Sequence, residues 1–564
     1  MIKIIVLITF LIASTAIHAD DSPCKNIHIK QGEIEGEYFK TYPSCRYLGL
    51  PFAEAPVGKL RFKPTKTPPL PFKTKPFIAK TFSAGCIQNC DLQHPEASCP
   101  KTQSEDCLFL NVYTPTTTTS NNNKDKDDDK LAVLLFIHGG NYIVGAGGVD
   151  LYDGSRFASH HNIIVVTINY RLGIFGGLTT SSKIAVGNYN LQDQRAAMKW
   201  VKENIDFFGG DANRITIMGQ SAGAFSVSSH LASPKSWPYF DSAIVESMPY
   251  ALPTENQNNT KTAELIGDEV LIQLNCSSIE CLQNTSPEDI LNVQQNGKLN
   301  KIFPIKDYLY KPMPWTPIVS NEKDAELPYT PLEAAMNGKF KKCPIILGTV
   351  ANESVQFVWG VQPKPMPKIE FDLFVETLFG LKFGEEVLKL YGPPPANETK
   401  DTRYFLSILG TDYIFKCPNR YAAKGYSQKV DTYMYRFAHL LSYNTFLQNA
   451  SVPECDDYVC HGTDLPILFN TEYLTPGKDV PQPTSEEHVL SMQMQTAFSN
   501  FAKSGNPNMP VALPTQSGKN TLTWDNYDFN QDNVFKFDTP SSNENNLRKK
   551  FCDYFDTIGY YRTG

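Results

Sequence analysis

A serine between two glycines is the feature of this sequence with the clearest chemical meaning. The apolar run at residues 214–219 leads into Gly219-Gln-Ser-Ala-Gly223, and residues 224–231 can continue as a helix. Glycine at 219 and 223 leaves room for a strand to turn sharply into a helix, which exposes the hydroxyl of Ser221 above the positive helix end. Gly-x-Ser-x-Gly alone occurs by chance, but its strand–turn–helix context predicts that Ser221 is a nucleophile.

A glycine-rich stretch upstream answers a need that such a nucleophile creates. Attack on an ester carbonyl generates an oxyanion, which requires backbone N–H donors already aimed at it. Phe136-Ile-His-Gly-Gly-Asn141 follows an apolar run, and Ala222 comes directly after the serine. Alone, the upstream stretch would be interpreted as a glycine turn. Beside the serine motif it predicts an oxyanion hole formed by Gly140, Asn141 and Ala222.

A serine nucleophile also needs a base, and the base needs an acid that orients it. With a serine motif of this kind, the expected chain order is serine, then acid, then histidine. Glu353 follows the apolar run at residues 343–348, and His461 begins His-Gly-Thr-Asp further along the chain. The sequence holds ten histidines, so chain order alone does not select His461.

Short apolar runs supply the elements that must position these groups. They are rich in Val, Ile and Leu without strict alternation, which is typical of strands buried on both faces of a sheet. Apolar residues recur at helical spacing over 190–208, and Gly209-Gly210 follows them. This predicts a helix between the strands at 163–169 and 214–219. Strands that alternate with helices indicate an α/β fold with a mainly parallel centre. The predicted strands are 131–138, 163–169, 214–219, 242–245, 343–348 and 432–437.

A low-complexity segment interrupts this pattern at residues 116–130. It reads TTTTSNNNKDKDDDK and contains no apolar residue, so it cannot contribute to a core. The runs before and after it, 106–113 and 131–136, resemble neighbouring strands. We therefore predict a solvated loop between two adjacent strands, in preference to a linker between domains.

The N-terminus has the pattern of a secretory signal. Lys3 precedes the apolar run Ile4–Ala13, and small residues follow as far as Ala19. This predicts a signal peptide at residues 1–19; an N-terminal anchor or a buried helix is the alternative interpretation. The run is too short to span a bilayer, and no later stretch approaches the ~20 apolar residues of a membrane helix, so no membrane anchor is expected.

Composition excludes several classes of protein. Hydrophobic residues make up 41% and charged residues 20% of 564 residues, which excludes wholesale disorder, a collagen and a pure coiled coil. With 52 basic and 59 acidic residues, the net charge is −7, so nucleic-acid binding is not expected.

Thirteen cysteines agree with an oxidising compartment. None of their groups has the tight Cys and His spacings of zinc ligation, so no metal is predicted. Cys343, inside an apolar run, is the candidate for an unpaired cysteine.

Several longer stretches together carry a family resemblance: residues 47–62, 104–113, 169–173, 208–211 and the serine motif. They resemble the type-B carboxylesterases, the cholinesterase-like branch of the α/β-hydrolases. The resemblance implies one α/β-hydrolase domain over residues 20–564, with a mostly parallel mixed sheet flanked by helices and long insertions that form a gorge. It also implies a triad of Ser221, Glu353 and His461, although Val350 stands where the family usually has Asn.

The same resemblance implies the disulfides Cys86–Cys107, Cys276–Cys281 and Cys417–Cys552. Proximity along the chain alone suggests Cys24–Cys45, Cys90–Cys99 and Cys455–Cys460. In a secreted chain, Asn-x-Ser/Thr sequences are glycan acceptors, and Asn352 is discounted because it adjoins Glu353 and is expected to be buried. The predicted glycosylation sites are Asn258, Asn275, Asn284, Asn397 and Asn449.

Three further motifs depart from the family pattern. Gln220 replaces the usual Glu before the nucleophile and removes a charge from the pocket. Asn141 replaces the third glycine of the oxyanion loop, keeping the N–H but adding a side chain. Glu246-Ser-Met248 replaces Gln-Ser-Gly and is expected to narrow the acyl side. In addition, no tryptophan lies between Cys86 and Cys107, where cholinesterases hold choline, so a choline ester is not the expected substrate.

These observations predict a secreted or vesicle-lumen serine carboxylic-ester hydrolase that acts on a small-molecule ester through an acyl-enzyme and needs no cofactor. A hydrolase-fold storage, structural or adhesion protein with little turnover is the alternative. A lipase acting at an oil surface has weaker support, because no amphipathic lid can be identified. The sequence determines neither the acyl and alcohol preference nor the oligomeric state.

Overall fold

The computed structural model describes residues 23–560 with gaps. The gaps are residues 25, 91–98, 117–129, 253–258, 297–298, 300–312, 321, 397, 444–452, 472–482 and 516–521. The predicted signal peptide and nearly all of the low-complexity segment therefore lie outside the described residues. So do three of the predicted glycosylation sites, Asn258, Asn397 and Asn449.

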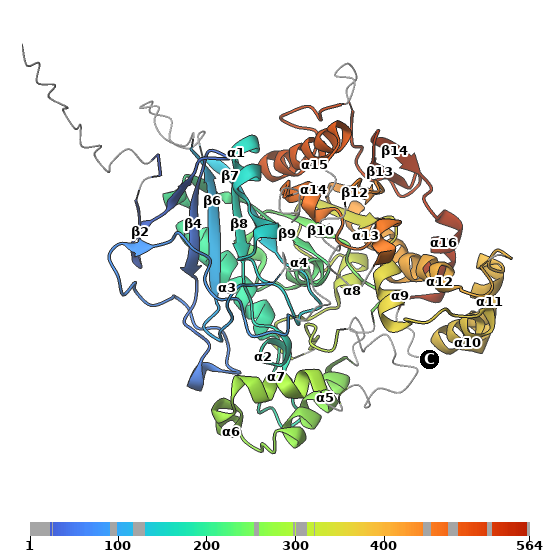
Figure 1. Cartoon of the computed structure of the whole chain (residues 1–564), viewed down its shortest axis with the longest axis horizontal. Helices are drawn as coiled ribbons and strands as arrows, with labels where there is room; N and C mark the ends of the chain where they lie inside the picture. The colour runs from blue at the N-terminus through green and yellow to red at the C-terminus, as the bar shows by residue number, and fades with distance from the viewer. Residues whose placement is uncertain are drawn as a thin grey trace, which may run out of the picture.

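A large mixed sheet forms the centre of the molecule (Figure 1). Within the described residues it has eleven strands in the order β14-β13-β12-β11-β10-β9-β7-β8-β6-β4-β3. The seven strands from β13 to β8 are mutually parallel, and antiparallel strands complete both edges. The parallel strands are β7 (Leu131–Ile137), β8 (Ile164–Ile168), β9 (Gly210–Gln220), β10 (Ser242–Glu246), β11 (Ile345–Val350), β12 (Thr432–Phe437) and β13 (Asn533–Phe537).

Each of the six predicted apolar strands contributes to this parallel centre, which confirms the predicted α/β class. The antiparallel edge strands have mixed sequences that apolar runs do not reveal. They are β3 (Glu37–Phe39), β4 (Ser44–Pro51), β6 (Phe109–Pro115) and β14 (Ser542–Asn545). A separate small sheet contains β1 (Ile27–Ile29), β2 (Gly32–Glu35) and β5 (Phe77–Ile78).

The predicted adjacency of the strands on either side of the low-complexity segment is wrong. β8 lies between β6 and β7, and its Val166 pairs with Val112 of β6 on one side and with Leu135 of β7 on the other. The reason is topological. A crossover through α1 (Ser155–His161) returns the chain parallel to β7, and the returning strand enters on the side of β6.

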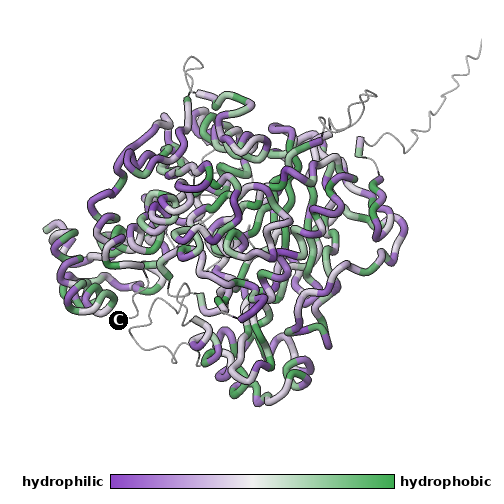
Figure 2. The backbone as a smooth tube through the Cα atoms, turned by 180° about the vertical axis from the view of Figure 1, so that it is seen from behind, coloured by the Kyte–Doolittle hydropathy of each residue, from purple (hydrophilic) through white to green (hydrophobic). Residues whose placement is uncertain are grey.

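Helices cover both faces of the sheet. Leu135 belongs to the apolar cluster that includes Trp200 of α3 and Phe225 of α4, whereas its neighbour Leu134 packs with Phe157 of α1 and Phe498 of α15. Figure 2 shows hydrophobic strands through the middle of the molecule and more hydrophilic backbone around them. These helices are α3 (Tyr189–Asn204), α4 (Ala222–Ala232) and α15 (Ser485–Ser504). After α3 a 3-10 turn continues to Phe208 and ends at Gly209, the predicted stop, which has a φ of 84°.

Helices in the second half of the chain form two groups outside the sheet. One group, seen at the bottom of Figure 1, contains α5 (Asn259–Gln273), α6 (Ile279–Asn284) and α7 (Pro287–Asn296). The other contains α9 (Val355–Val361), α10 (Lys368–Phe379), α11 (Leu381–Tyr391), α12 (Arg403–Gly410), α13 (Cys417–Ser427) and α16 (Lys549–Ile558). A π-helical turn, Thr411–Lys416, joins α12 to α13. Shorter helices are α2 (Gly173–Gly177), α8 (Pro331–Met336) and α14 (Leu465–Phe469). In the part of the chain described, no helix is both long and apolar enough to cross a membrane.

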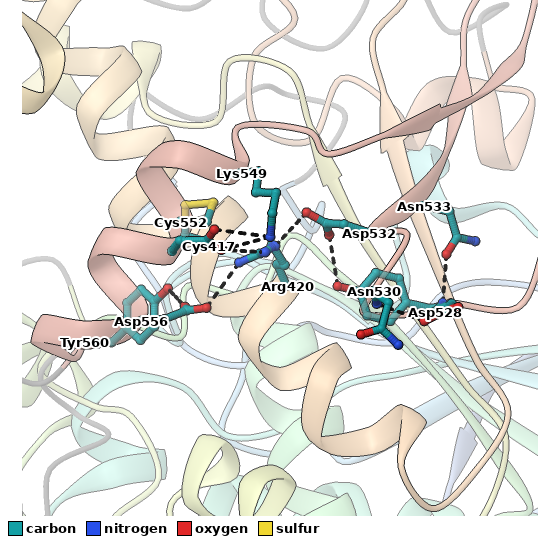
Figure 3. Close-up of polar contacts among 12 residues, drawn as sticks. Cys417, Arg420, Asp528, Asn530, Asp532, Asn533, Lys549, Cys552, Asp556 and Tyr560 are labelled. Atoms are coloured by element: carbon teal, nitrogen blue, oxygen red, sulfur yellow. Dashed lines mark hydrogen bonds and ion pairs between the residues drawn. A yellow bond between two sulfur atoms is a disulfide. The ribbon is translucent and has the colours of Figure 1, made fainter.

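Six disulfides cross-link the described residues, and one of them joins distant parts of the chain. The structure contains all six expected pairs, and Cys343 is free and buried. Cys417–Cys552 ties the start of α13 to α16 across a sequence separation of 135 residues. Arg420, one turn further along α13, lies between Asp532 and Asp556 (Figure 3). Its guanidinium donates hydrogen bonds of 2.8 Å to Asp532 and 3.1 Å to Asp556. A covalent bond and an ionic cluster thus anchor the same corner of the molecule.

Candidate active site

Ser221 occupies a sharp turn between β9 and α4. Its φ of 59° and ψ of −122° are strained for a residue with a side chain. The flanking glycines make the turn possible. A Cβ on Gly219 would lie 2.4 Å from the backbone of Gly223, and a Cβ on Gly223 would lie 2.0 Å from the carbonyl oxygen of Ile137. The turn therefore tolerates no side chain at either glycine, as the motif predicts.

The glycine loop after β7 lies against this turn. A Cβ on Gly139 would lie 2.7 Å from the carbonyl oxygen of Gln220, and Gly140 has a φ of 106° that favours glycine. No described residue accepts a hydrogen bond from the backbone N–H of Gly140, Asn141 or Ala222. The predicted oxyanion-hole N–H groups are thus not engaged by other described residues. Asn141 and Ser221 also line the same cavity.

Glu353 and His461 meet although 108 residues separate them in the chain. Oε2 of Glu353 lies 2.5 Å from Nδ1 of His461, and Oε1 accepts a hydrogen bond of 2.8 Å from the backbone N–H of Val350. Both side chains are buried. The rings of Phe357 and Phe415 flank the imidazole with centroids 5.2 Å away.

This contact determines the tautomer of the neutral imidazole. An ionised carboxylate only accepts hydrogen bonds, so Nδ1 of His461 carries the proton and Nε2 carries the lone pair. Nε2 lies 3.1 Å from the side-chain Nε2 of Gln220, the residue before the nucleophile. Within the described chain, Ser221 Oγ and His461 Nε2 form no hydrogen bond. The predicted acid and base are therefore in contact, and the base reaches the residue next to Ser221.

A cavity of about 350 Å³ opens beside Ser221. Among the described residues that line it, none is acidic or basic, and the polar side chains are few, including Asn141, Ser221, Ser354 and Gln356. Helices α9, α10 and α12 and the π-helical turn supply most of the wall. The apolar lining residues include Leu252, Met313, Phe357, Val358, Phe374, Leu378, Phe379, Leu406, Leu409, Ile414 and Phe415. Such a wall suits an uncharged, apolar group.

The expected narrowing by Met248 is wrong. Met248 is fully buried, and its carbonyl accepts a hydrogen bond of 2.7 Å from Asn419. It does not appear among the described lining residues, where Pro249 and Leu252 form the adjacent wall. The side chain is therefore part of the buried core and not of the cavity wall.

Two further carboxyl groups lie buried near the predicted acid, and sequence reasoning assigned them no role. Burial raises the pKa of Glu246 well above its usual range, and the charge of Asp464 adds to the shift. Burial, and then the charge of Glu353, raise the pKa of Asp464 to about 7. Both side-chain oxygens of Glu246 lack partners among the described residues, and Tyr435 donates to Asp464 at 3.4 Å. The signal in the sequence was Glu246 itself, a departure from the family pattern.

The asparagines of the described glycosylation sequences differ in exposure. Asn275 and Asn284 are exposed on the surface. Asn352, expected to be buried, is instead half-buried. Its Oδ1 accepts a hydrogen bond of 3.2 Å from the backbone N–H of Val459, so the side chain is engaged within the fold.

No group of three or more His, Cys, Asp or Glu side chains within the described residues is arranged to hold a metal ion.

The strained serine turn on a mostly parallel sheet defines an α/β-hydrolase. Comparison with known proteins gives the family: the sequence profile of the carboxylesterase family matches residues 23–555, and the chain belongs to this family. It is accordingly a carboxylic ester hydrolase by class, and the resemblance stated from its motifs is confirmed.

Individual relatives are similar over most of the chain. "Crystal protein" of Dictyostelium discoideum is 34% identical, over 94% of this chain and 90% of that protein. "Carboxylesterase 1E" of Rattus norvegicus is 30% identical, over 93% and 91%. "Acetylcholinesterase 1" of Caenorhabditis elegans is 33% identical, over 83% and 76%. The solved structure of a thermophilic pNB esterase matches with a TM-score of 0.75 at 27% identity, covering 94% of this chain and 99% of that one.

Proposed function

We propose that the protein is a serine carboxylic-ester hydrolase that works through an acyl-enzyme, with Ser221, His461 and Glu353 as its triad. One observation carries this proposal: the buried 2.5 Å contact between Glu353 and His461, which leaves the lone pair of Nε2 beside the strained turn that holds Ser221. Strain of this kind at a turn is retained where function needs it.

The proposed reaction follows from these groups. Nε2 of His461 takes the proton of Ser221 as Oγ attacks the ester carbonyl. The N–H groups of Gly140, Asn141 and Ala222 stabilise the oxyanion, each contributing about 2.7–4 kcal/mol if it resembles measured donors of this type. His461 then protonates the departing alcohol, and water activated by the same imidazole releases the acid. Glu353 keeps the imidazole in the required tautomer throughout.

The cavity supports a substrate class. Its wall of Phe, Leu, Val and Ile side chains contains no charged residue among those described, so transfer of a cationic or anionic group into it would carry a large desolvation penalty. We infer an uncharged ester whose acyl or alcohol part is bulky and apolar. This agrees with the absence of a tryptophan between Cys86 and Cys107, which argues against a choline ester.

Disulfides support a location in the secretory pathway, either outside the cell or in the lumen of a vesicle. Six disulfides among the described residues persist only in an oxidising compartment. The predicted signal peptide would deliver the chain there.

A storage or structural protein with weak turnover is the second candidate. It is favoured by the contact of His461 with Gln220, because no described hydrogen bond joins His461 to Ser221. "Crystal protein", at 34% identity, is one of the relatives of this chain. In this case the site would retain its geometry with little catalysis.

Labelling with a fluorophosphonate separates the two candidates, because only an activated serine reacts quickly. We expect the wild type to be labelled and to hydrolyse p-nitrophenyl butyrate, and Ser221→Ala to do neither. Hydrolysis by the wild type should decline as pH falls through the histidine range, since the base must be uncharged. Equal rates for the two proteins would refute the nucleophile, and an unlabelled, inactive wild type would favour the second candidate.

A further inference from the structure

Gln220, the residue before the nucleophile, has a contact that gives it a role of its own. Its side chain is 4% exposed, and its Nε2 lies 3.1 Å from Nε2 of His461. We propose that Gln220 is a positioning residue that holds the lone pair of His461 away from Ser221 until substrate binds. This inference rests on the proposed function, because it requires His461 to act as the base.

The direction of this hydrogen bond follows from Glu353. Because the carboxylate of Glu353 engages the Nδ1 side of the ring, neutral His461 presents only a lone pair at Nε2. A lone pair needs a donor, and the carboxamide of Gln220 has one in its NH₂ group. A carboxylate at position 220 could not make this bond, because an ionised carboxylate has no proton to donate.

The carboxamide has little freedom to leave this position. Gln220 ends β9 and pairs with Glu246 of β10 in the parallel register. On the other side, a Cβ on Gly139 would lie only 2.8 Å from Oε1 of Gln220. The glycine loop therefore closes over the oxygen end of the carboxamide while the nitrogen end faces His461.

Competition for one lone pair is the consequence. Nε2 of a neutral imidazole accepts one strong hydrogen bond, so it cannot serve Gln220 and Ser221 together. The described structure has the bond to Gln220 and lacks the bond to Ser221. Because the carboxamide is held in place, the triad is completed only when the imidazole of His461 shifts its lone pair from Gln220 to the hydroxyl of Ser221, which costs the resting enzyme the stability of one bond. A net hydrogen bond of ordinary strength corresponds to about a 2- to 12-fold change in an equilibrium constant.

The same bond stabilises the uncharged imidazole and so affects pH dependence. Other titratable groups face or surround His461, and they are identical in every variant compared below. They are Glu353 after β11, Asp464 beside α14, Glu246 at the end of β10, Lys416 in the π-helical turn and Tyr435 on β12. Differences between variants at position 220 therefore report the contact of Gln220 alone.

Two substitutions at position 220 test the role of the donor. Gln220→Met keeps the length of the side chain and removes the donor. We expect fluorophosphonate labelling at high pH to accelerate about 2- to 12-fold, and the midpoint of the acid limb of kcat/KM to rise by about 0.4–1.1 pH units. Gln220→Glu places an acceptor beside the imidazolium, so its midpoint should rise further. A merely structural role would lower the rate and leave the midpoint unchanged.

Matched controls use Gln428, an exposed residue that follows α13. Gln428→Met and Gln428→Glu should both retain the wild-type rate and midpoint. An active wild type whose Gln220 variants keep the same midpoint and labelling rate would overturn this inference and leave the proposed function standing. An inactive, unlabelled wild type would overturn both. If Gln220→Met fails to fold by circular dichroism, the midpoint of Gln220→Glu alone decides.

Discussion

Removal of the disulfide between Cys417 and Cys552 should destabilise the protein far more than removal of the one between Cys276 and Cys281. The first closes a loop of 135 residues and the second a loop of 5. In the chain-entropy description, loops of these lengths correspond to about 5 and about 2 kcal/mol of unfolding free energy. Cys417 and Cys552 are also fully buried, so alanine there leaves small voids that add to the loss.

The long-range disulfide also bears on the candidate site. Cys417 follows directly on the π-helical turn, whose residues Tyr413, Ile414 and Phe415 line the cavity. Without the disulfide, α13 remains attached to this corner through the contacts of Arg420 with Asp532 and Asp556 seen in Figure 3. We therefore expect the π-helical turn in the cavity wall to become disordered before the rest of the molecule unfolds. Hydrolysis by this variant should then be lost at a lower urea concentration than the midpoint of global unfolding.

Two double variants measure the difference: Cys417→Ala with Cys552→Ala, and Cys276→Ala with Cys281→Ala. Tryptophan fluorescence in urea gives the unfolding midpoint of each, and p-nitrophenyl butyrate hydrolysis in the same solutions follows the site. The variant without Cys417–Cys552 should lose about 3 kcal/mol more unfolding free energy than the variant without Cys276–Cys281. Equal midpoints, or a greater loss in the short-loop variant, would refute the loop-length argument.

Three further predictions concern ionisable groups. Glu353→Gln should lower kcat/KM by about 10⁴-fold, because the imidazole is no longer held in one tautomer. Serine proteases that lose the corresponding acid show a loss of this size. Steady-state kinetics would check this, with circular dichroism as a control for folding. Burial lowers the pKa of His439, but hydrogen bonds and charges of Glu487 and Asp538 outweigh it, and the net shift is upward. This contribution to stability is complete below the unfolded value of about 6.5 and is lost as pH rises through the folded value, so His439→Gln should be destabilising at pH 6 and nearly neutral at pH 9 in urea titrations. Burial raises the pKa of Glu246, with the charge of Asp464 adding to the shift, so the contribution of this group to stability is lost as pH rises above about 4.3. Glu246→Gln should therefore melt like the wild type at pH 4 and at a higher temperature at pH 8; a constant difference between them would contradict this assignment.

Local steric demands explain what could be predicted from the sequence. The serine turn is encoded by Gly219 and Gly223, whose missing side chains are needed within a few residues of Ser221. The central strands are encoded by apolar runs that only a sheet covered on both faces can bury. In both cases the sequence pattern that reveals the element lies within a short segment, although the room that Gly223 provides is needed by the backbone of Ile137 on a neighbouring strand.

Long-range arrangement explains what could not be predicted. The order of β6, β8 and β7 depends on which side of the sheet the crossover through α1 returns, and no apolar run encodes that choice. The burial of Glu246 near Asp464 depends on the end of β10 and the start of α14, which are far apart in the chain. The burial of Met248 away from the cavity likewise depends on the packing of α13, whose Asn419 bonds to its carbonyl.

The departures at positions 220 and 246 are two halves of one exchange. The family pattern has a carboxylate before the nucleophile and a carboxamide at the end of the next strand, whereas this chain has Gln220 and Glu246, which are register partners on β9 and β10. The two ends thus keep one carboxyl and one carboxamide, in reversed positions. Because burial favours the protonated form of Glu246, the exchange also removes a negative charge from beside the imidazole. Glu353 then remains the carboxylate in direct contact with His461, and the donor at position 220 decides when the base becomes available.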